Sequence, residues 1–264
     1  MSKTGSAAKV KLNSFDDLFG TEQPQTGTEQ VQEIALSELH EFKGHPFKVL
    51  DDEKMQETME SIREHGVLMP GIARPMKDGG YEIIAGHRRR HACELVGLTT
   101  MPMFIRDYTD DQATIIMVDS NIQREDILPS EKAKAYFMKY EAVKHQGKKG
   151  KGNSLDEVGE TAGESAKTVQ RYIYLAHLSD ALLDMVDKKK IGIVQGVELS
   201  FLTEQQQEWV QVVLEETGVI ISTVQVSRLK EYGKSDELTL PMVRLILTEP
   251  KPIERKVTIK ADKI

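Results

Sequence analysis

The sequence predicts two folded parts in series, an α+β domain followed by an all-α domain. Apolar segments with strand character, separated by turn residues, are confined to the chain before residue 109. From Asp110 onward the strand signals fade, and apolar residues recur at helical spacing. The length, 264 residues, accommodates two modest domains with tails.

The first part of the chain alternates short strands with one clear helix. Residues 1–29 are rich in Ser, Thr, Gly, Gln and Lys, which predicts a flexible tail. Strand character begins at 31–36, and a helix with one apolar face is expected at 55–65, before Gly66. The pattern then predicts a hairpin of 71–76 and 81–84 and a strand at 102–105, so the first domain is expected to span 30–108.

The all-α part is expected to open with two connecting helices within 109–146. One has helical spacing over 110–120, and Pro129 suits the start of the second. The basic, glycine-rich residues 147–152 follow. Lys148 and Lys149 could contact DNA phosphates there, or this could be an ordinary solvated loop.

Residues 153–175 have the layout of a helix-turn-helix. Ser154 and Glu157 have the spacing of a capping box, and Gly163 suits the left-handed turn between the helices. The second helix carries one apolar face and one polar face. Its candidate DNA-binding residues are Ser165, Lys167, Thr168, Gln170 and Arg171. An ordinary helical hairpin would show the same pattern. A DNA-binding domain over 147–231 is expected, followed by a linker and an incomplete C-terminal segment over 232–264.

Residues 81–92 are the strongest candidate for a ligand site. An apolar strand ends at Gly86, and a helix begins in a run of basic residues that includes Arg88 and Arg89. Free N–H groups at a helix start, with guanidinium groups beside them, suit a phosphate. Asn121 and Arg124 add polar groups downstream, so the pattern indicates a nucleoside triphosphate site. The alternative is a basic helix start on the surface.

Composition excludes several classes of protein. A net charge of −7 rules out a uniformly basic nucleic-acid coat, so any DNA contact must come from a local patch. The single cysteine, Cys93, excludes an internal disulfide framework and fits a reducing compartment. No apolar run is long enough for a membrane span and no signal peptide is present, so we expect a soluble intracellular protein.

The order of these parts resembles the ParB partition proteins over roughly residues 8–230. The segment from Gly86 to Arg89, then His91-Ala92, occupies the place of the family's glycine, acidic residue, two arginines and Arg-Ala pair. Residues 120–127, with Pro129 and Glu131, resemble the second family motif. Residues 14–20 resemble the N-terminal peptide that engages a ParA-type ATPase. The resemblance implies a ParB/sulfiredoxin-like N-terminal domain followed by a helix-turn-helix domain.

The resemblance also implies a function: a homodimeric DNA clamp that loads on a centromere-like site and is switched by CTP and Mg²⁺ to slide. The implied nucleotide-binding residues are Gly86, His87, Arg88, Arg89, Asn121 and Arg124, with Asn121 helping to place the metal. Such a protein is cytoplasmic and associated with the nucleoid or a plasmid. Weak CTP hydrolysis is left open.

Two departures from the family pattern concern the metal. His87 and Ser120 stand where family members commonly have glutamates, and a neutral imidazole is a poor Mg²⁺ ligand. Asp119 or Glu125 could substitute. In addition, residues 44–49 only partly resemble the family's Pro-x-x-Pro-Arg box, and 257–259 resemble only the first strand of a C-terminal dimerisation module.

Two other functions are consistent with the sequence. One is a nucleotide-independent, site-specific transcriptional regulator that keeps the fold. The other is an ATP-using enzyme of the sulfiredoxin or free-serine kinase type. Cys93 lies inside the expected helix and not in the turn before it, which argues against sulfiredoxin chemistry.

Overall fold

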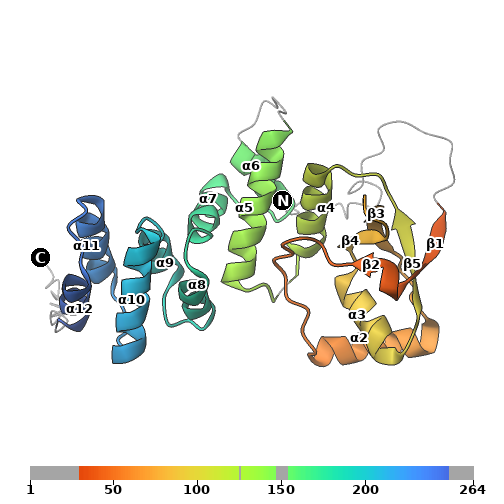
Figure 1. Cartoon of the computed structure of the whole chain (residues 1–264), viewed down its shortest axis with the longest axis horizontal. Helices are drawn as coiled ribbons and strands as arrows, with labels where there is room; N and C mark the ends of the chain where they lie inside the picture. The colour runs from red at the N-terminus through yellow and green to blue at the C-terminus, as the bar shows by residue number, and fades with distance from the viewer. Residues whose placement is uncertain (1–29, 125, 147–153, 250–264) are drawn as a thin grey trace, which may run out of the picture.

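The computed structural model describes residues 30–124, 126–146 and 154–249 (Figure 1). Its strands are β1 Val31–Ala35, β2 Leu39–His40, β3 Gly71–Pro75, β4 Tyr81–Ala85 and β5 Thr100–Ile105, with a short 3-10 helix η1 at Leu36–Glu38. Its helices are α2 Glu53–His65, α3 His87–Val96, α4 Asp110–Asn121, α5 Pro129–His145, α6 Ser154–Glu160, α7 Ala166–Leu175, α8 Asp180–Asp187, α9 Ile193–Leu199, α10 Glu204–Thr217, α11 Thr223–Lys234 and α12 Leu240–Thr248. The predicted α+β domain followed by helices is confirmed.

The five strands form one mixed sheet in the order β1-β5-β3-β4-β2. β3 and β4 form the predicted antiparallel hairpin, and β1 pairs antiparallel with β5. β3 runs parallel to β5, which requires the crossover through α3. The two-residue β2, which the sequence did not reveal, pairs parallel with β4 at the sheet edge.

Both faces of the sheet are covered by helices because side chains alternate along each strand. Ala73 and Ile83 face a core formed with α2 and α3, which contribute Met55 and Cys93. The neighbouring residues Ile72 and Ile84 face a second core formed with α4 and α5. Figure 1 shows α2 and α3 together on one side of the sheet and α4 beside α5.

Helix α5 joins the sheet domain to the rest of the chain. Its Tyr136 is fully buried in the core that also contains Ile84 of β4 and Val169 of α7. Its Ala133 belongs to a third core, shared with α8 to α12. Figure 1 shows α5 between the sheet domain and the row of helices that ends with α11 and α12.

The boundary expected at residue 231 is wrong, because helices continue through the segment read as a linker. α11 runs to Lys234, and α12 occupies residues 240–248. Val243, Ile246 and Leu247 of α12 are buried against α10 and α11 because they recur on one face of the helix. The short polar stretch before α12 is a turn between helices.

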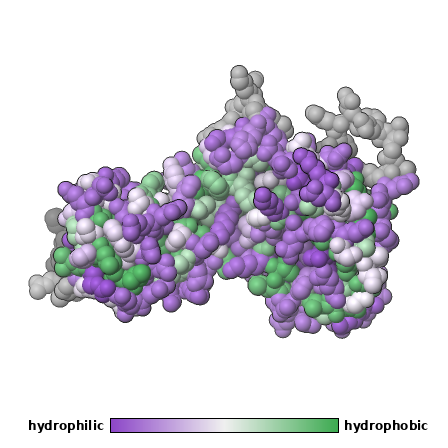
Figure 2. All heavy atoms as spheres, viewed as in Figure 1, coloured by the Kyte–Doolittle hydropathy of each residue, from purple (hydrophilic) through white to green (hydrophobic). Residues whose placement is uncertain are grey.

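Several expectations lie outside the described residues: the N-terminal tail and its peptide at 14–20, Glu125, Lys148 and Lys149, and the strand at 257–259. Ser154 is the first residue of α6. Among the described residues, no helix is both long and apolar enough to cross a membrane. Figure 2 shows hydrophilic residues over most of one face, with hydrophobic residues gathered near α10 and α12.

Candidate nucleotide pocket and DNA-reading helix

The turn from β4 into α3 depends on a glycine. Gly86 has φ +115°, and a Cβ at this position would lie 3.2 Å from Gly71 Cα and 3.3 Å from Met101 Cε. Its carbonyl accepts the hydrogen bond from Arg90 N at 2.9 Å, so the helix begins directly after it. The first backbone N–H groups of α3 therefore lie beside the turn, where helix geometry leaves them without helical partners.

A pocket of about 160 Å³ opens at this turn. It is lined by all six residues expected to bind the nucleotide: Gly86, His87, Arg88, Arg89, Asn121 and Arg124. It is also lined by His45, Val49, Ala85 and Ser120, which were not among the expected ligands. His45 and Val49 belong to the segment 44–49 that partly resembles a family motif, so that resemblance was the available signal. The structure thus brings together three chain segments, 45–49, 85–89 and 120–124.

Arg89 is a half-buried cation held by neutral groups. One guanidinium nitrogen, Nη1, donates to the carbonyl of Pro70 at 2.8 Å and also to that of Met69. Its partial burial lowers the pKa of Arg89 from its ordinary value. Among the described residues no carboxylate pairs with it, and a charge that is partly withdrawn from water without a counter-ion is costly. The arrangement therefore favours an anion in the pocket.

Arg88, by contrast, is already paired. Its guanidinium donates to both oxygens of Asp52, at 2.8 Å to Oδ1 and 3.4 Å to Oδ2. This contact lowers the pKa of Asp52, whose Oδ1 also caps α2 by accepting from Met55 N at 2.9 Å. The pair fixes Arg88 at the pocket edge and ties the start of α3 to the start of α2.

His45 and His87 stack against each other in the pocket wall. Their ring centroids lie 3.8 Å apart with planes tilted by 36°. His45 Nδ1 lies 2.8 Å from the Phe47 carbonyl, so it must donate there. Both Nε2 atoms are buried without a hydrogen-bond partner among the described residues. Burial, and then the neighbouring His45 and Arg90, lowers the pKa of His87 to about 3, and burial lowers the pKa of His45.

The pocket does not fit a Mg²⁺ ion held by protein side chains. None of its lining residues is Asp or Glu, and the described residues contain no group of three or more His, Cys, Asp or Glu suited to a metal. Asn121 offers one neutral oxygen, since its amide nitrogen donates to the Met117 carbonyl at 2.8 Å. Mg²⁺ prefers carboxylate oxygens. Asp119 is no substitute because it pairs with Lys139.

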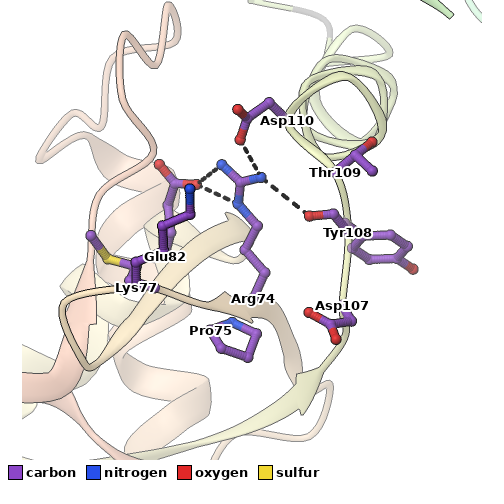
Figure 3. Close-up of a pocket in the computed structure, with 9 residues that line it drawn as sticks. Arg74, Pro75, Lys77, Glu82, Asp107, Tyr108, Thr109 and Asp110 are labelled. Carbon is purple, nitrogen blue, oxygen red and sulfur yellow. Dashed lines mark hydrogen bonds and ion pairs between the residues drawn. The ribbon is translucent and has the colours of Figure 1, made fainter.

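A larger cavity of about 580 Å³ lies at the other end of the hairpin (Figure 3). Its central cation, Arg74, donates to Glu82 Oε2 from Nε at 2.7 Å and to the Tyr108 carbonyl at 3.2 Å, and pairs with Asp110 at 2.6 Å. These contacts occupy the guanidinium group. We therefore assign Arg74 a structural role, joining the hairpin to the start of α4, and place the ligand site at Gly86.

Helices α6 and α7 lie where a helix-turn-helix is predicted and are joined by a short turn. Gly163 in the turn has φ +65°, and Ser165 caps α7 by accepting from Thr168 N at 3.3 Å. Val169 and Ile173 are buried against α5 and α6. Lys167, Gln170 and Arg171 are exposed on the opposite face, and Thr168 is half-buried at its margin. The residues expected to read DNA therefore share an accessible surface.

The pocket and the pair of helices α6 and α7 are directly linked. Gln123, between pocket residues 121 and 124, donates from Nε2 to the Thr161 carbonyl in the turn after α6 at 3.2 Å. Lys139 of α5 pairs with Asp119 of α4 and also donates to Thr161 Oγ1 at 3.2 Å. These contacts join residues far apart in the sequence, which periodicity does not reveal.

Comparison with known proteins gives a match to one family model and several proteins of similar sequence. A family model described as the ParB N-terminal domain matches residues 20–122. The chain is 31% identical over 182 residues to a nucleoid occlusion protein of Halalkalibacterium halodurans, covering 69% of this chain and 61% of that protein. A solved structure of C-terminally truncated ParB from Caulobacter crescentus, complexed to the centromeric parS site, aligns with a TM-score of 0.41 and 20% identity over 77% of this chain and 99% of that one.

A further relative establishes the family. The protein named probable chromosome 1-partitioning protein ParB from Deinococcus radiodurans is 32% identical over 212 residues. The matched region covers 80% of this chain and 70% of that protein, so it extends well beyond the length of the ParB N-terminal domain matched at 20–122. On this similarity the chain belongs to the ParB family.

Proposed function

We propose that this protein is a DNA-binding partition protein that loads on a centromere-like site through α7 and binds CTP in the pocket at Gly86. The observation that carries the nucleotide part is Arg89, a half-buried guanidinium group whose hydrogen bonds go to carbonyls and leave its charge uncompensated among the described residues. A triphosphate would supply the missing negative charge.

The names of the relatives support nucleoid DNA as the proposed binding partner. Their names assign chromosome partition to the Deinococcus radiodurans protein and nucleoid occlusion to the Halalkalibacterium halodurans protein. Both activities act on the nucleoid, which agrees with the exposed polar face of α7. We extend the proposal to the rest of the family pattern: a homodimer that closes as a sliding clamp when CTP binds, and a ParA-type ATPase that contacts residues 14–20. Any Mg²⁺ carried by the nucleotide would find one side-chain oxygen at Asn121.

An enzyme of the sulfiredoxin type is disfavoured. Cys93 is fully buried inside α3, and burial raises the pKa of its thiol. Because the thiolate is the nucleophile, such a cysteine is poorly suited to attack phosphate or sulfur.

The test is whether CTP closes the dimer. Arg89→Ala should keep specific DNA binding and abolish CTP-induced cross-linking between subunits. Arg63→Ala, at an exposed position on α2, is the matched control and should cross-link like the wild type. Normal closure of the Arg89 variant would refute the switch. If CTP has no effect even on the wild type while site-specific DNA binding persists, the protein is the nucleotide-independent regulator instead.

A further inference from the structure

We propose that the pocket at Gly86 takes the nucleoside triphosphate as the metal-free anion, so that Mg²⁺ is not required for binding and weakens it. The inference rests on the proposed nucleotide function of this same pocket. It follows from the chemistry of the lining, which offers donors to an anion and no charged ligand to a hard cation.

Three of the described acidic side chains near the site are engaged elsewhere. Asp52 accepts from Arg88, and Asp119 lies 2.5 Å from Lys139 Nζ. The two oxygens of Glu131 accept from the backbone N–H groups of Lys48 at 2.8 Å and Leu128 at 3.1 Å. Recruiting any of these carboxylates to a metal would break an interaction that holds α2, α4 or α5 in place.

A second, smaller cavity lies behind His87 and does contain acids. It measures about 80 Å³ and is lined in part by Glu41 and Glu94, together with His87 and Arg90. Glu94 pairs with Arg90 at 2.8 Å, so its charge is already offset. Neither acid lines the pocket that opens at Gly86. His87 therefore forms the wall between the anion pocket and these acids.

The two imidazoles are poorly arranged to chelate a metal together. The two rings face each other at 3.8 Å with planes tilted by 36°, whereas two imidazole ligands of one ion must approach it edge-on. His87 Nε2, buried without a partner, donates one hydrogen bond to an anion when it carries the ring proton. Together with the α3 backbone N–H groups and Arg89, it forms a set of donors.

Charge then decides which form of the nucleotide binds. Free CTP carries a charge of about −4, and a bound Mg²⁺ ion reduces it to about −2. Where the protein supplies ligands to the ion, this loss is offset by coordination. Where it supplies only cations and N–H donors, the metal removes attraction and adds a hydration shell that must fit a pocket of about 160 Å³. The metal-free anion is the better ligand here.

The experiment is calorimetric titration of CTP into the whole protein, once in EDTA and once in millimolar Mg²⁺. We expect the Kd to be smaller in EDTA than in Mg²⁺ by more than about threefold. A Kd that is equal in the two buffers, or smaller in Mg²⁺, overturns this inference and leaves the proposed function intact. Absence of binding in both buffers overturns the proposed function itself.

A pair of variants tests residue 87 directly. His87→Glu places a carboxylate in the pocket wall and should make binding depend on Mg²⁺, with a Kd at least about tenfold lower in Mg²⁺ than in EDTA. His87→Gln, similar in size but neutral, should keep the wild-type ratio of the two Kd values. Thermal melts confirm that both variants are folded. A glutamate variant with the wild-type ratio, or a glutamine variant that becomes Mg²⁺-dependent, overturns the assignment.

Discussion

Lys139 Nζ lies 2.5 Å from Asp119 Oδ1 in the interior of the protein, where the lysine side chain is only 4% exposed. The same ammonium group donates to the Val158 carbonyl at 3.3 Å and to Thr161 Oγ1 at 3.2 Å. One buried cation thereby connects α4, α5 and the turn after α6. Asp119 directly precedes Ser120 and Asn121 of the pocket, so the lysine links the proposed nucleotide site to the helices proposed to bind DNA.

Replacing this lysine should destabilise the whole chain. Lys139→Met keeps the aliphatic stem but leaves Asp119 without its cation, so we expect a loss of about 3–5 kcal/mol in the free energy of unfolding. Urea denaturation followed by circular dichroism measures it. Lys144→Met is the control on the same helix: its pair with Glu141 is exposed and should contribute less than about 1 kcal/mol. Equal losses in the two variants would contradict the role of Lys139.

The conformation of Gly86 gives a second prediction. Gly86→Ala should lower the free energy of unfolding by about 1–2 kcal/mol because alanine is strained in the left-handed backbone conformation. The loss should be larger still because the new Cβ would press on Gly71 Cα. Gly97→Ala shares the positive φ, at +82°, but has open space around the new methyl group. The difference in unfolding free energy between the two variants measures the cost of the close approach of the new Cβ to Gly71 Cα. Gly86→Ala should also weaken CTP binding, while Gly97→Ala should not.

The buried His87 predicts a pH dependence of stability. Its folded pKa of about 3 lies below the ordinary value of 6.5, so between these values the unfolded chain binds more protons. Stability should therefore fall as the pH drops below 6.5, by up to about 1.4 kcal/mol per pH unit for this one group. Urea midpoints of the wild type and His87→Gln, compared from pH 7 to pH 5, measure the effect. A variant with the wild-type slope would assign the pH dependence to other groups.

The exposed face of α7 predicts how DNA binding responds to mutation. Arg171→Ala should weaken binding to the specific site by about 1–3 kcal/mol if the guanidinium group contacts a base edge. Arg63→Ala, which removes an exposed arginine from α2, should leave the affinity unchanged. Fluorescence anisotropy at a fixed salt concentration measures the DNA affinity of the two variants. If the variant loses equal affinity for random and for specific DNA, Arg171 contacts a phosphate and not a base edge.

Local patterns and the family resemblance together predicted most of the elements and six of the ten residues that line the pocket. The β4-Gly86-α3 turn is readable because an apolar strand, a glycine and a basic helix start follow one another in the chain. The capped start of α7 is readable for the same reason. The residues of the two motifs at 86–89 and 121–124 do meet, as the resemblance implied.

What the sequence did not reveal depends on contacts between distant residues. The stacking of His45 on His87 joins positions 42 residues apart, since 87 − 45 = 42. The parallel pairing of the two-residue β2 with β4 has too short a pattern to read. α12 was missed because polar residues flank its short apolar face. That face can be recognised as part of a core only once α10 and α11 are seen to pack against it.

The hydrophobic core that contains Tyr136 crosses the boundaries expected from the sequence at residues 108 and 146. It includes Ile84 from the sheet, Met117 from α4 and Val169 from α7. A cut between the sheet domain and the helix-turn-helix would therefore expose apolar surface on both fragments. Residues 30–124, 126–146 and 154–176 should melt in one cooperative transition, so a nucleotide bound at Gly86, as proposed, would stabilise α7 as well as its own pocket.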